Sequence, residues 1–83
     1  MTDSHHQIVA HLIKRLRTEA GLKQTDLSQR LGVTQSIVSK FESGERRLDL
    51  IEVWQICQIC GVSLEDFVRR VAEALREGTD ARQ

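Results

Sequence analysis

The sequence of 83 residues contains no proline, no tyrosine, only two cysteines and no net charge. Two cysteines are too few for the disulfide framework of a small secreted domain. No apolar run approaches the roughly 18 residues of a membrane span, and the first residues lack the basic and apolar regions of a signal peptide. Charged residues make up 29% of the chain, which excludes a highly charged disordered tail. We therefore expect one globular domain in the cytoplasm, away from membranes.

The neutral total conceals an uneven distribution of charge. Residues 1–48 carry eight Lys and Arg against five Asp and Glu, whereas residues 49–83 carry four against seven. A polyanion would therefore be attracted to the first half of the chain and repelled by the second. Because a domain this small buries only about 60% of its unfolded surface, we expect self-association to contribute to its stability.

Apolar residues recur at helical spacing, and no long alternating run predicts a strand. One apolar face, ended by Gly21, consists of Val9, Leu12, Ile13, Leu16 and Ala20. Further helices are expected over 24–31, 35–43, about 50–60 and 64–77, with residues 1–6 and 79–83 frayed. The sequence thus predicts an all-α fold, a single compact five-helix domain over 1–83 with an ordered core of about 7–78.

Residues at the expected helix boundaries predict how the helices start and stop. Thr34 and Ser63 each offer a hydroxyl that accepts a hydrogen bond from a first-turn N–H. Asp49 with Glu52 has the spacing of a capping box. Gly78 is expected to end the last helix.

Residues 24–43 have the organisation of a helix-turn-helix, with a turn of about three residues that contains Gly32. Ser28 is placed where the two helix axes cross closely and a large side chain would separate them. Gly32 is placed where the chain needs a left-handed conformation, which costs least for glycine. The residues expected to be buried between these helices and the first are Leu27, Leu31, Val33, Val38 and Phe41.

The run GLKQTDLSQRLGVTQSIVSKFESGERR resembles the phage-repressor-like (Cro/C1, XRE) family of bacterial helix-turn-helix transcriptional regulators, over about residues 8–70. The spacing that carries the resemblance involves Gln24, Leu27, Gly32, Ser39, Glu42 and Gly44. The resemblance implies a lambda-repressor-like domain whose third helix enters the major groove of DNA. It also implies a homodimer that binds a palindromic operator.

The resemblance assigns DNA contacts to Gln24, Thr34, Gln35, Ser36, Ser39, Lys40, Arg46 and Arg47, and the chemistry of its side chain adds Ile37 to the candidate DNA-binding residues. Gln24 is implied to contact a phosphate and to brace the third helix. Gln35 suits the edge of an adenine, Lys40 suits a guanine, and Ile37 could lie against a thymine methyl group. Thr34 and the two arginines would contact phosphates.

The resemblance also implies a structural ion pair between Arg17 and Glu42 that ties the first helix to the end of the third; direct contact of Arg17 with a phosphate is the alternative. Two positions depart from the family pattern. Lys23 stands where a Ser, Thr or Asn usually caps the second helix, which predicts weaker capping. Ile37 replaces a residue that is more often small and polar.

Cys57 and Cys60 form a C-x-x-C pair, for which a redox or metal switch is one interpretation. They lie mid-helix among apolar residues without a second ligand pair, so core packing is favoured. The histidines lie in or near the N-terminal segment, and no catalytic set occurs at a usable spacing. We therefore expect no enzymatic activity, no metal, no cofactor and no small-molecule ligand.

Dimerisation is expected on the helices over about 50–60 and 64–77, because one subunit cannot fill both of their apolar faces; the alternative is that these faces complete the core. The candidate interface residues are Leu64, Phe67, Val68, Val71 and Leu75.

The predicted protein is a homodimeric DNA-binding regulator that acts at promoters, where RNA polymerase is a possible partner. It resembles restriction–modification controllers and small phage or plasmid repressors. The alternative is an antitoxin-type module that binds a partner protein and regulates its own operon.

Overall fold

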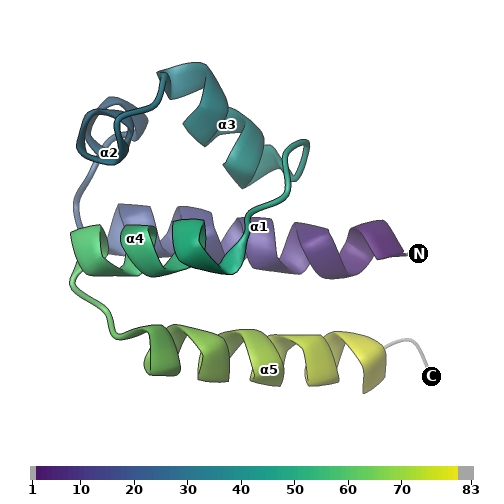
Figure 1. Ribbon diagram of the computed structural model, residues 1–83. Coiled ribbons are helices and arrows are strands. Elements are labelled where there is room, and N and C mark those ends of the chain that lie inside the picture. Colours follow the sequence, from purple (N-terminus) through teal and green to yellow (C-terminus); the bar gives the residue numbers. More distant parts are fainter. Residues whose placement is uncertain (1, 81–83) are drawn as a thin grey trace.

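The computed structural model describes residues 2–80 and contains five helices in that range: α1 (Thr2–Glu19), α2 (Gln24–Leu31), α3 (Gln35–Ser43), α4 (Leu50–Cys60) and α5 (Leu64–Asp80). No strand occurs within these residues. Helices α1, α4 and α5 run alongside one another, and α2 and α3 lie on the side away from α5 (Figure 1). The predicted all-α, five-helix fold is confirmed.

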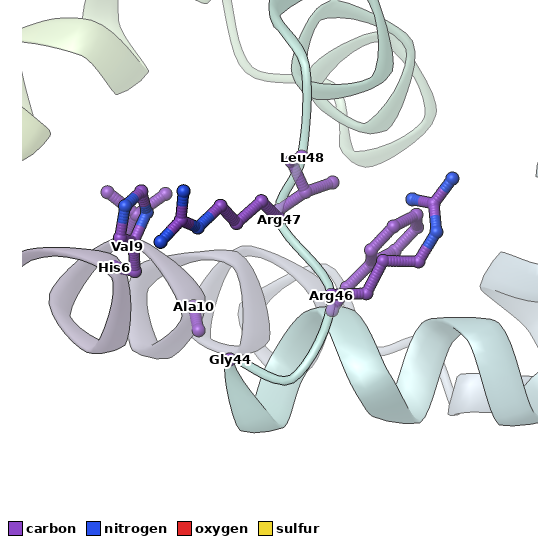
Figure 2. A pocket seen from close by; sticks show the side chains of 8 residues that line it. His6, Val9, Ala10, Gly44, Arg46, Arg47 and Leu48 are labelled. Atoms are coloured by element: carbon purple, nitrogen blue, oxygen red, sulfur yellow. The ribbon is translucent and has the colours of Figure 1, made fainter. Parts of the chain in front are cut away.

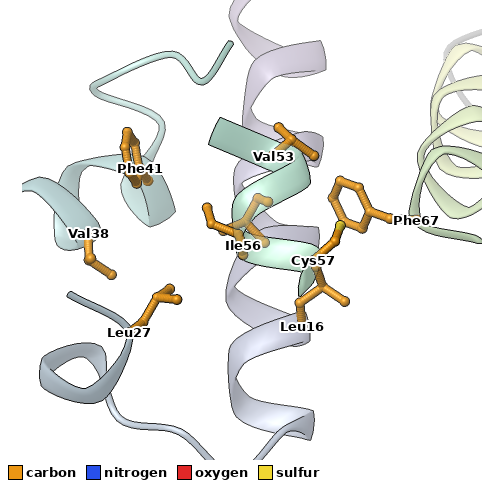
Figure 3. Packing of buried hydrophobic residues seen from close by; sticks show 9 residues of the cluster. Leu16, Leu27, Val38, Phe41, Val53, Ile56, Cys57 and Phe67 are labelled. Atoms are coloured by element: carbon orange, nitrogen blue, oxygen red, sulfur yellow. The ribbon is translucent and has the colours of Figure 1, made fainter. Parts of the chain in front are cut away.

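All five helices contribute to one hydrophobic core, most of which is shown in Figure 3. Its buried members are Ile13, Leu16, Leu27, Val38, Phe41, Val53, Ile56, Cys57 and Phe67. Val33 was also expected here, but its side chain is exposed. The chain turns sharply after Gly32, which has a φ of 76°, and the turn carries Val33 to the surface.

The helix starts follow the predicted capping pattern. Thr34 Oγ1 accepts a hydrogen bond from the Ile37 N–H at 3.3 Å, and Asp49 and Glu52 form the reciprocal capping box. At α2 the Lys23 side chain makes no cap hydrogen bond, because an ammonium group has no lone pair to offer. The Lys23 N–H does donate to Asp26 Oδ2 at 2.8 Å, so α2 has one of the two reciprocal cap hydrogen bonds that α4 has.

Both terminal helices are longer than expected. α1 begins at Thr2, within the segment predicted to fray, and α5 continues through Gly78 to Asp80. Near its start α1 is tied to α3, because Gln7 Nε2 donates to the Ser43 carbonyl at 3.0 Å. An isolated glycine within a helix costs only about 1 kcal/mol, which α5 tolerates. The predicted fraying of residues 1 and 81–83 lies outside the described residues.

Candidate nucleic-acid interface

Helix α3 has one buried and one exposed side. Val38 and Phe41 point into the core, as Figure 3 shows. The opposite side is polar and exposed, and it consists of Gln35, Ser36, Ser39, Lys40 and Ser43. Ile37 is half-buried and packs against the core, so only part of its side chain is available to a thymine methyl group. The major groove of DNA is wide enough to admit an α-helix with such a face.

Ser28 and Gly32 serve the junction of α2 and α3 in different ways. Ser28 is buried, and its hydroxyl donates to the Thr25 carbonyl at 2.8 Å within its own helix. Gly32 ends α2 in the left-handed conformation, and its N–H donates to the Ser28 and Gln29 carbonyls. The left-handed conformation predicted for Gly32 is confirmed, and the burial of Ser28 agrees with a place between the two helices.

A buried ion pair joins α1 to the end of α3. Arg17 Nε lies 2.6 Å from Glu42 Oε2, and Arg17 Nη2 lies 3.0 Å from Glu42 Oε1. The two side chains are only 10% and 4% exposed. Arg17 Nη1 donates in addition to the Leu22 carbonyl at 2.8 Å. The hydrogen bonds to Glu42 raise the pKa of Arg17 above its ordinary value, and a guanidinium enclosed in this way is not available to a phosphate.

Two glutamines extend this ion pair to the exposed face of α3. Gln24 Nε2 donates to Glu42 Oε1 at 3.0 Å, and Gln35 Nε2 donates to Gln24 Oε1 at 3.3 Å. Because the Glu42 carboxylate only accepts, it orients the Gln24 amide, which in turn makes Gln35 the donor. Gln35 keeps one N–H and its carbonyl oxygen for a ligand. These are the two groups that pair with the N7 and N6 edge of adenine.

Within α3 no carboxylate is exposed, whereas Glu45 in the loop after it is exposed and accepts a hydrogen bond from Ser43 Oγ at 3.0 Å. Glu42 is the one acidic residue of α3, and its carboxylate is buried against Arg17. Lys40 is exposed on the same helix. A phosphate backbone approaching α3 would therefore meet polar donors and a cation.

The two arginines after α3 differ in their surroundings. Arg46 Nη1 pairs with Glu52 Oε2 at 3.1 Å, and its guanidinium carbon lies 4.8 Å from the centre of the Phe41 ring. Arg47 is exposed and has no ion pair or hydrogen bond with the residues that the structure describes. Figure 2 shows the two side chains pointing in opposite directions from the loop. Arg47 is thus the cation of this loop that is more available to an anion.

Comparison with known proteins identifies this arrangement. Residues 13–67 match the helix-turn-helix family model HTH_3. The chain is 34% identical over 62 residues to an uncharacterized HTH-type transcriptional regulator of Sinorhizobium fredii, covering 75% of this chain and 80% of that protein. The chain belongs to the XRE-family helix-turn-helix transcriptional regulators. The family is a non-enzymatic, DNA-binding class, in agreement with the sequence prediction.

Two solved structures show the same fold as this XRE-family chain. An XRE-family like protein from Pseudomonas syringae is 35% identical, with a TM-score of 0.78, and the match covers 87% of this chain and 88% of that one. The clp gene regulator ClgR of Corynebacterium glutamicum has a TM-score of 0.82 at 15% identity, covering 94% and 83% of the two chains. The second similarity concerns the fold alone.

The two cysteines of this XRE-family chain lie in apolar surroundings. Cys57 belongs to the core, and Cys60 is half-buried against it. Burial raises the pKa of both thiols, which lowers the fraction of reactive thiolate. Within residues 2–80 no three His, Cys, Asp or Glu side chains are grouped as a metal site, and no helix is long and apolar enough to span a membrane.

The candidate dimer interface needs one correction. Phe67 is only 2% exposed and lies in the core of its own chain, so it cannot form part of a subunit interface. Leu64 and Val71 are half-buried against the same core, and Leu75 is half-buried. The most exposed large apolar side chains of α4 and α5 are Leu50 (63%), Ile51 (62%), Val68 (48%) and Trp54 (44%).

Sequence reasoning did not find Gln7, which bonds the last carbonyl of α3 from a position 36 residues away. It also assigned the same role to both loop arginines. No local signal marks either feature, because a surface glutamine has no fixed partner and Arg46 and Arg47 are adjacent in sequence. The contacts depend on how α1 and α4 lie against the loop.

Proposed function

We propose that this XRE-family regulator is a homodimer that inserts α3 of each subunit into the major groove of a near-palindromic operator. The observation that carries the proposal is the chain of hydrogen bonds from Arg17 through Glu42 and Gln24 to Gln35. These bonds fix the side chain of Gln35 on the exposed face of α3 in the free protein. DNA binding then costs less side-chain entropy. The two recognition helices would lie about 34 Å apart, one turn of DNA.

The residues divide into those that read bases and those that fix position. Gln35 and Lys40 are placed to read adenine and guanine, with Ser36, Ser39 and the exposed part of Ile37 beside them. Gln24, Thr34 and Arg47 would bind phosphates, which sets the register without reading sequence. Arg46 must leave Glu52 to reach a phosphate, so we expect it to contribute less than Arg47.

The exposed apolar side chains of α4 and α5 support self-association. Trp54 and Leu64 line one surface groove, and Val68 follows one turn after Leu64 on α5. We propose that the interface consists of this face, with Leu50, Ile51, Trp54 and Val68 at its centre. It keeps Leu64 and Val68 from the residues that the sequence predicts and adds α4 side chains, whereas Phe67 is excluded because it is buried.

The regulator would act by occupying promoter DNA, either blocking RNA polymerase or placing itself beside it. Control through its own concentration, as in a restriction–modification controller or a small phage or plasmid repressor, fits a dimer of such small subunits. The exposed α4 face also favours a second candidate, an antitoxin-type module that binds another protein there. Both candidates bind promoter DNA, so the α4 face decides between them. If Trp54→Glu turns a stable dimer of the purified protein into monomers, that face is already covered by a second copy and the alternative is excluded as the main function.

The test of DNA reading is selection of bound fragments from random DNA, followed by titration of the selected operator. We expect a half-site repeated with two-fold symmetry, and affinity that falls steeply with salt. Gln35→Ala should lose about 1–3 kcal/mol on the selected operator and relax preference at one base pair. Gln29→Ala, which removes an exposed glutamine of α2, is the matched control and should bind as the unmodified protein does. An equal loss on all sequences would assign Gln35 to the backbone, and no selected sequence would contradict the proposal.

A further inference from the structure

A cavity of about 230 Å³ lies between the first half of α1, the end of α3 and the loop that follows it. Val9, Ala10, Phe41 and Leu48 form its apolar walls, and Gly44 lies at one edge. Figure 2 shows Val9, Ala10 and Leu48 around this cavity. It does not belong to the exposed face of α3, because Phe41 is on the buried side of that helix.

Three side chains that can be cationic or donate hydrogen bonds line this cavity: His6, Arg46 and Arg47. Figure 2 shows the Arg47 side chain extended toward His6 along α1. No carboxylate is among the lining residues. Arg47 also has no ion pair with any residue that the structure describes, whereas its neighbour Arg46 is paired with Glu52.

Charge and shape together specify the occupant of such a site. A guanidinium without a counter-ion favours an anion, and it binds a carboxylate through two parallel hydrogen bonds. The apolar walls favour a hydrocarbon body attached to that carboxylate. A dry apolar cavity of about 150 Å³ is enough to hold benzene, so 230 Å³ accommodates a small aromatic or short-chain acid.

We propose that this cavity binds a small carboxylate with an apolar body, whose carboxylate is held by Arg47 and His6 while its hydrocarbon part lies against Val9, Phe41 and Leu48. The sequence alone predicts no small-molecule ligand. The proposal therefore goes beyond the DNA-binding function and adds a second kind of ligand to the domain.

A bound carboxylate would also affect DNA binding, and this consequence rests on the proposed function. Arg47 is the loop cation most available to a phosphate, and one guanidinium cannot serve both anions fully. The carboxylate would therefore weaken DNA binding, and by linkage DNA would weaken carboxylate binding by the same factor. Such an acid would act as an inducer that releases the operator.

The test titrates ¹⁵N-labelled protein with benzoate in the absence of DNA. We expect saturable changes in the amide signals of Val9, Ala10, Gly44 and Leu48. Benzamide has nearly the same shape without the charge, and acetate has the charge without the ring, so both should bind much more weakly. Arg47→Gln should weaken benzoate binding by about tenfold or more. Arg69→Gln, which removes an exposed arginine on α5, should leave benzoate binding unchanged.

A second titration measures operator binding in benzoate against chloride at equal ionic strength. Benzoate should weaken binding by the unmodified protein and have no such effect on Arg47→Gln. Benzamide binding as tightly as benzoate, or amide changes confined to other surfaces, would overturn the site. Saturable benzoate binding by a protein that ignores DNA would leave the site standing and refute the proposed function. Benzoate binding without any effect on operator affinity would refute the inducer role alone.

Discussion

At the scale of single residues, Glu42 is the side chain on which the recognition surface depends. Its two oxygens receive Arg17 from α1 and Gln24 from α2, and through Gln24 it orients Gln35. One carboxylate thus connects three helices. A buried charge is tolerated only while its partners are present. Glu42 therefore contributes both to the stability of the fold and to the orientation of Gln35.

Glu42→Gln should destabilise the protein by about 3–5 kcal/mol, because it leaves the Arg17 guanidinium buried without its counter-ion. Unfolding in urea, followed by circular dichroism, measures the change. The matched control is Glu65→Gln at an exposed position of α5, which should alter stability by less than about 0.5 kcal/mol. Similar losses for the two variants would show that the ion pair contributes little.

The buried thiol of Cys57 predicts a loss of stability at alkaline pH. Burial is the main reason why the pKa of this thiol is raised in the folded chain, and the nearby Cys60 thiol raises it further by a smaller amount. The stability that a neutral thiol contributes is therefore complete below the unfolded pKa of about 8.5 and declines as the pH rises above it toward the folded value. Cys57→Val keeps the apolar volume and should reduce this decline. The test is urea unfolding of the unmodified protein and of Cys57→Val under reducing conditions at pH 7 and pH 9.5. An equal decline in the free energy of unfolding for the two proteins would contradict the prediction.

At the scale of elements, α3 is held at both ends by other parts of the chain. Thr34 caps its start, and Gln7 of α1 bonds its last carbonyl at Ser43. Gly44 follows with a φ of 85°, and a Cβ atom there would clash with Gln7 Nε2. Gly32, at the end of α2, has a similar φ of 76° and nothing within 4 Å of such an atom. A substitution at Gly32 therefore introduces backbone strain alone, whereas a substitution at Gly44 introduces backbone strain and a clash with α1.

Gly32→Ala should cost about 1–2 kcal/mol from the left-handed backbone alone. Gly44→Ala should cost about 0.5–1 kcal/mol more, because the new methyl group displaces Gln7 and breaks its hydrogen bond. Thermal unfolding of both variants measures the difference. In a Gln7→Ala background the two glycine substitutions should become equal. An excess that persists without Gln7 would place the cause elsewhere in the turn.

At the scale of the whole molecule, charge and apolar surface are segregated. Residues 53–64 contain no charged side chain, and this stretch includes most of α4 and the turn into α5. A charge-depleted, apolar surface with an exposed tryptophan has the composition of an interface centre. The cationic side chains that would approach DNA lie instead on α3 and the loop after it.

Trp54→Glu should convert the dimer to monomers and weaken operator binding, because a buried charge at the proposed interface has no partner. Sedimentation equilibrium at micromolar concentration measures the association, and circular dichroism should show an unchanged helical content. Leu75→Glu is the comparison variant on α5. Monomers from Leu75→Glu together with dimers from Trp54→Glu would return the interface to the face that the sequence predicts.

Much of the fold was predictable because its determinants are local. Helical periodicity and capping depend on residues three or four apart, so the helices of 24–31 and 35–43 and the caps at Thr34 and Asp49 were found from the sequence. The resemblance supplied the pairing of Arg17 with Glu42 across 25 residues. The predicted ends of α1 and α5 were wrong, because the contact of Gln7 with α3 ties down the start of α1 and a single glycine is too weak a signal to end α5.

The sequence by itself determined that the protein is an all-α domain with a helix-turn-helix, since spacing within each segment decides which side chains share a face. Only the tertiary structure decided which of those faces meet. It placed Phe67 in the core and Trp54 at the surface, paired Arg46 with Glu52, and left Arg47 over an apolar cavity. The physical reason is that burial and ion pairing depend on distances between helices, which the order of residues along one helix does not contain.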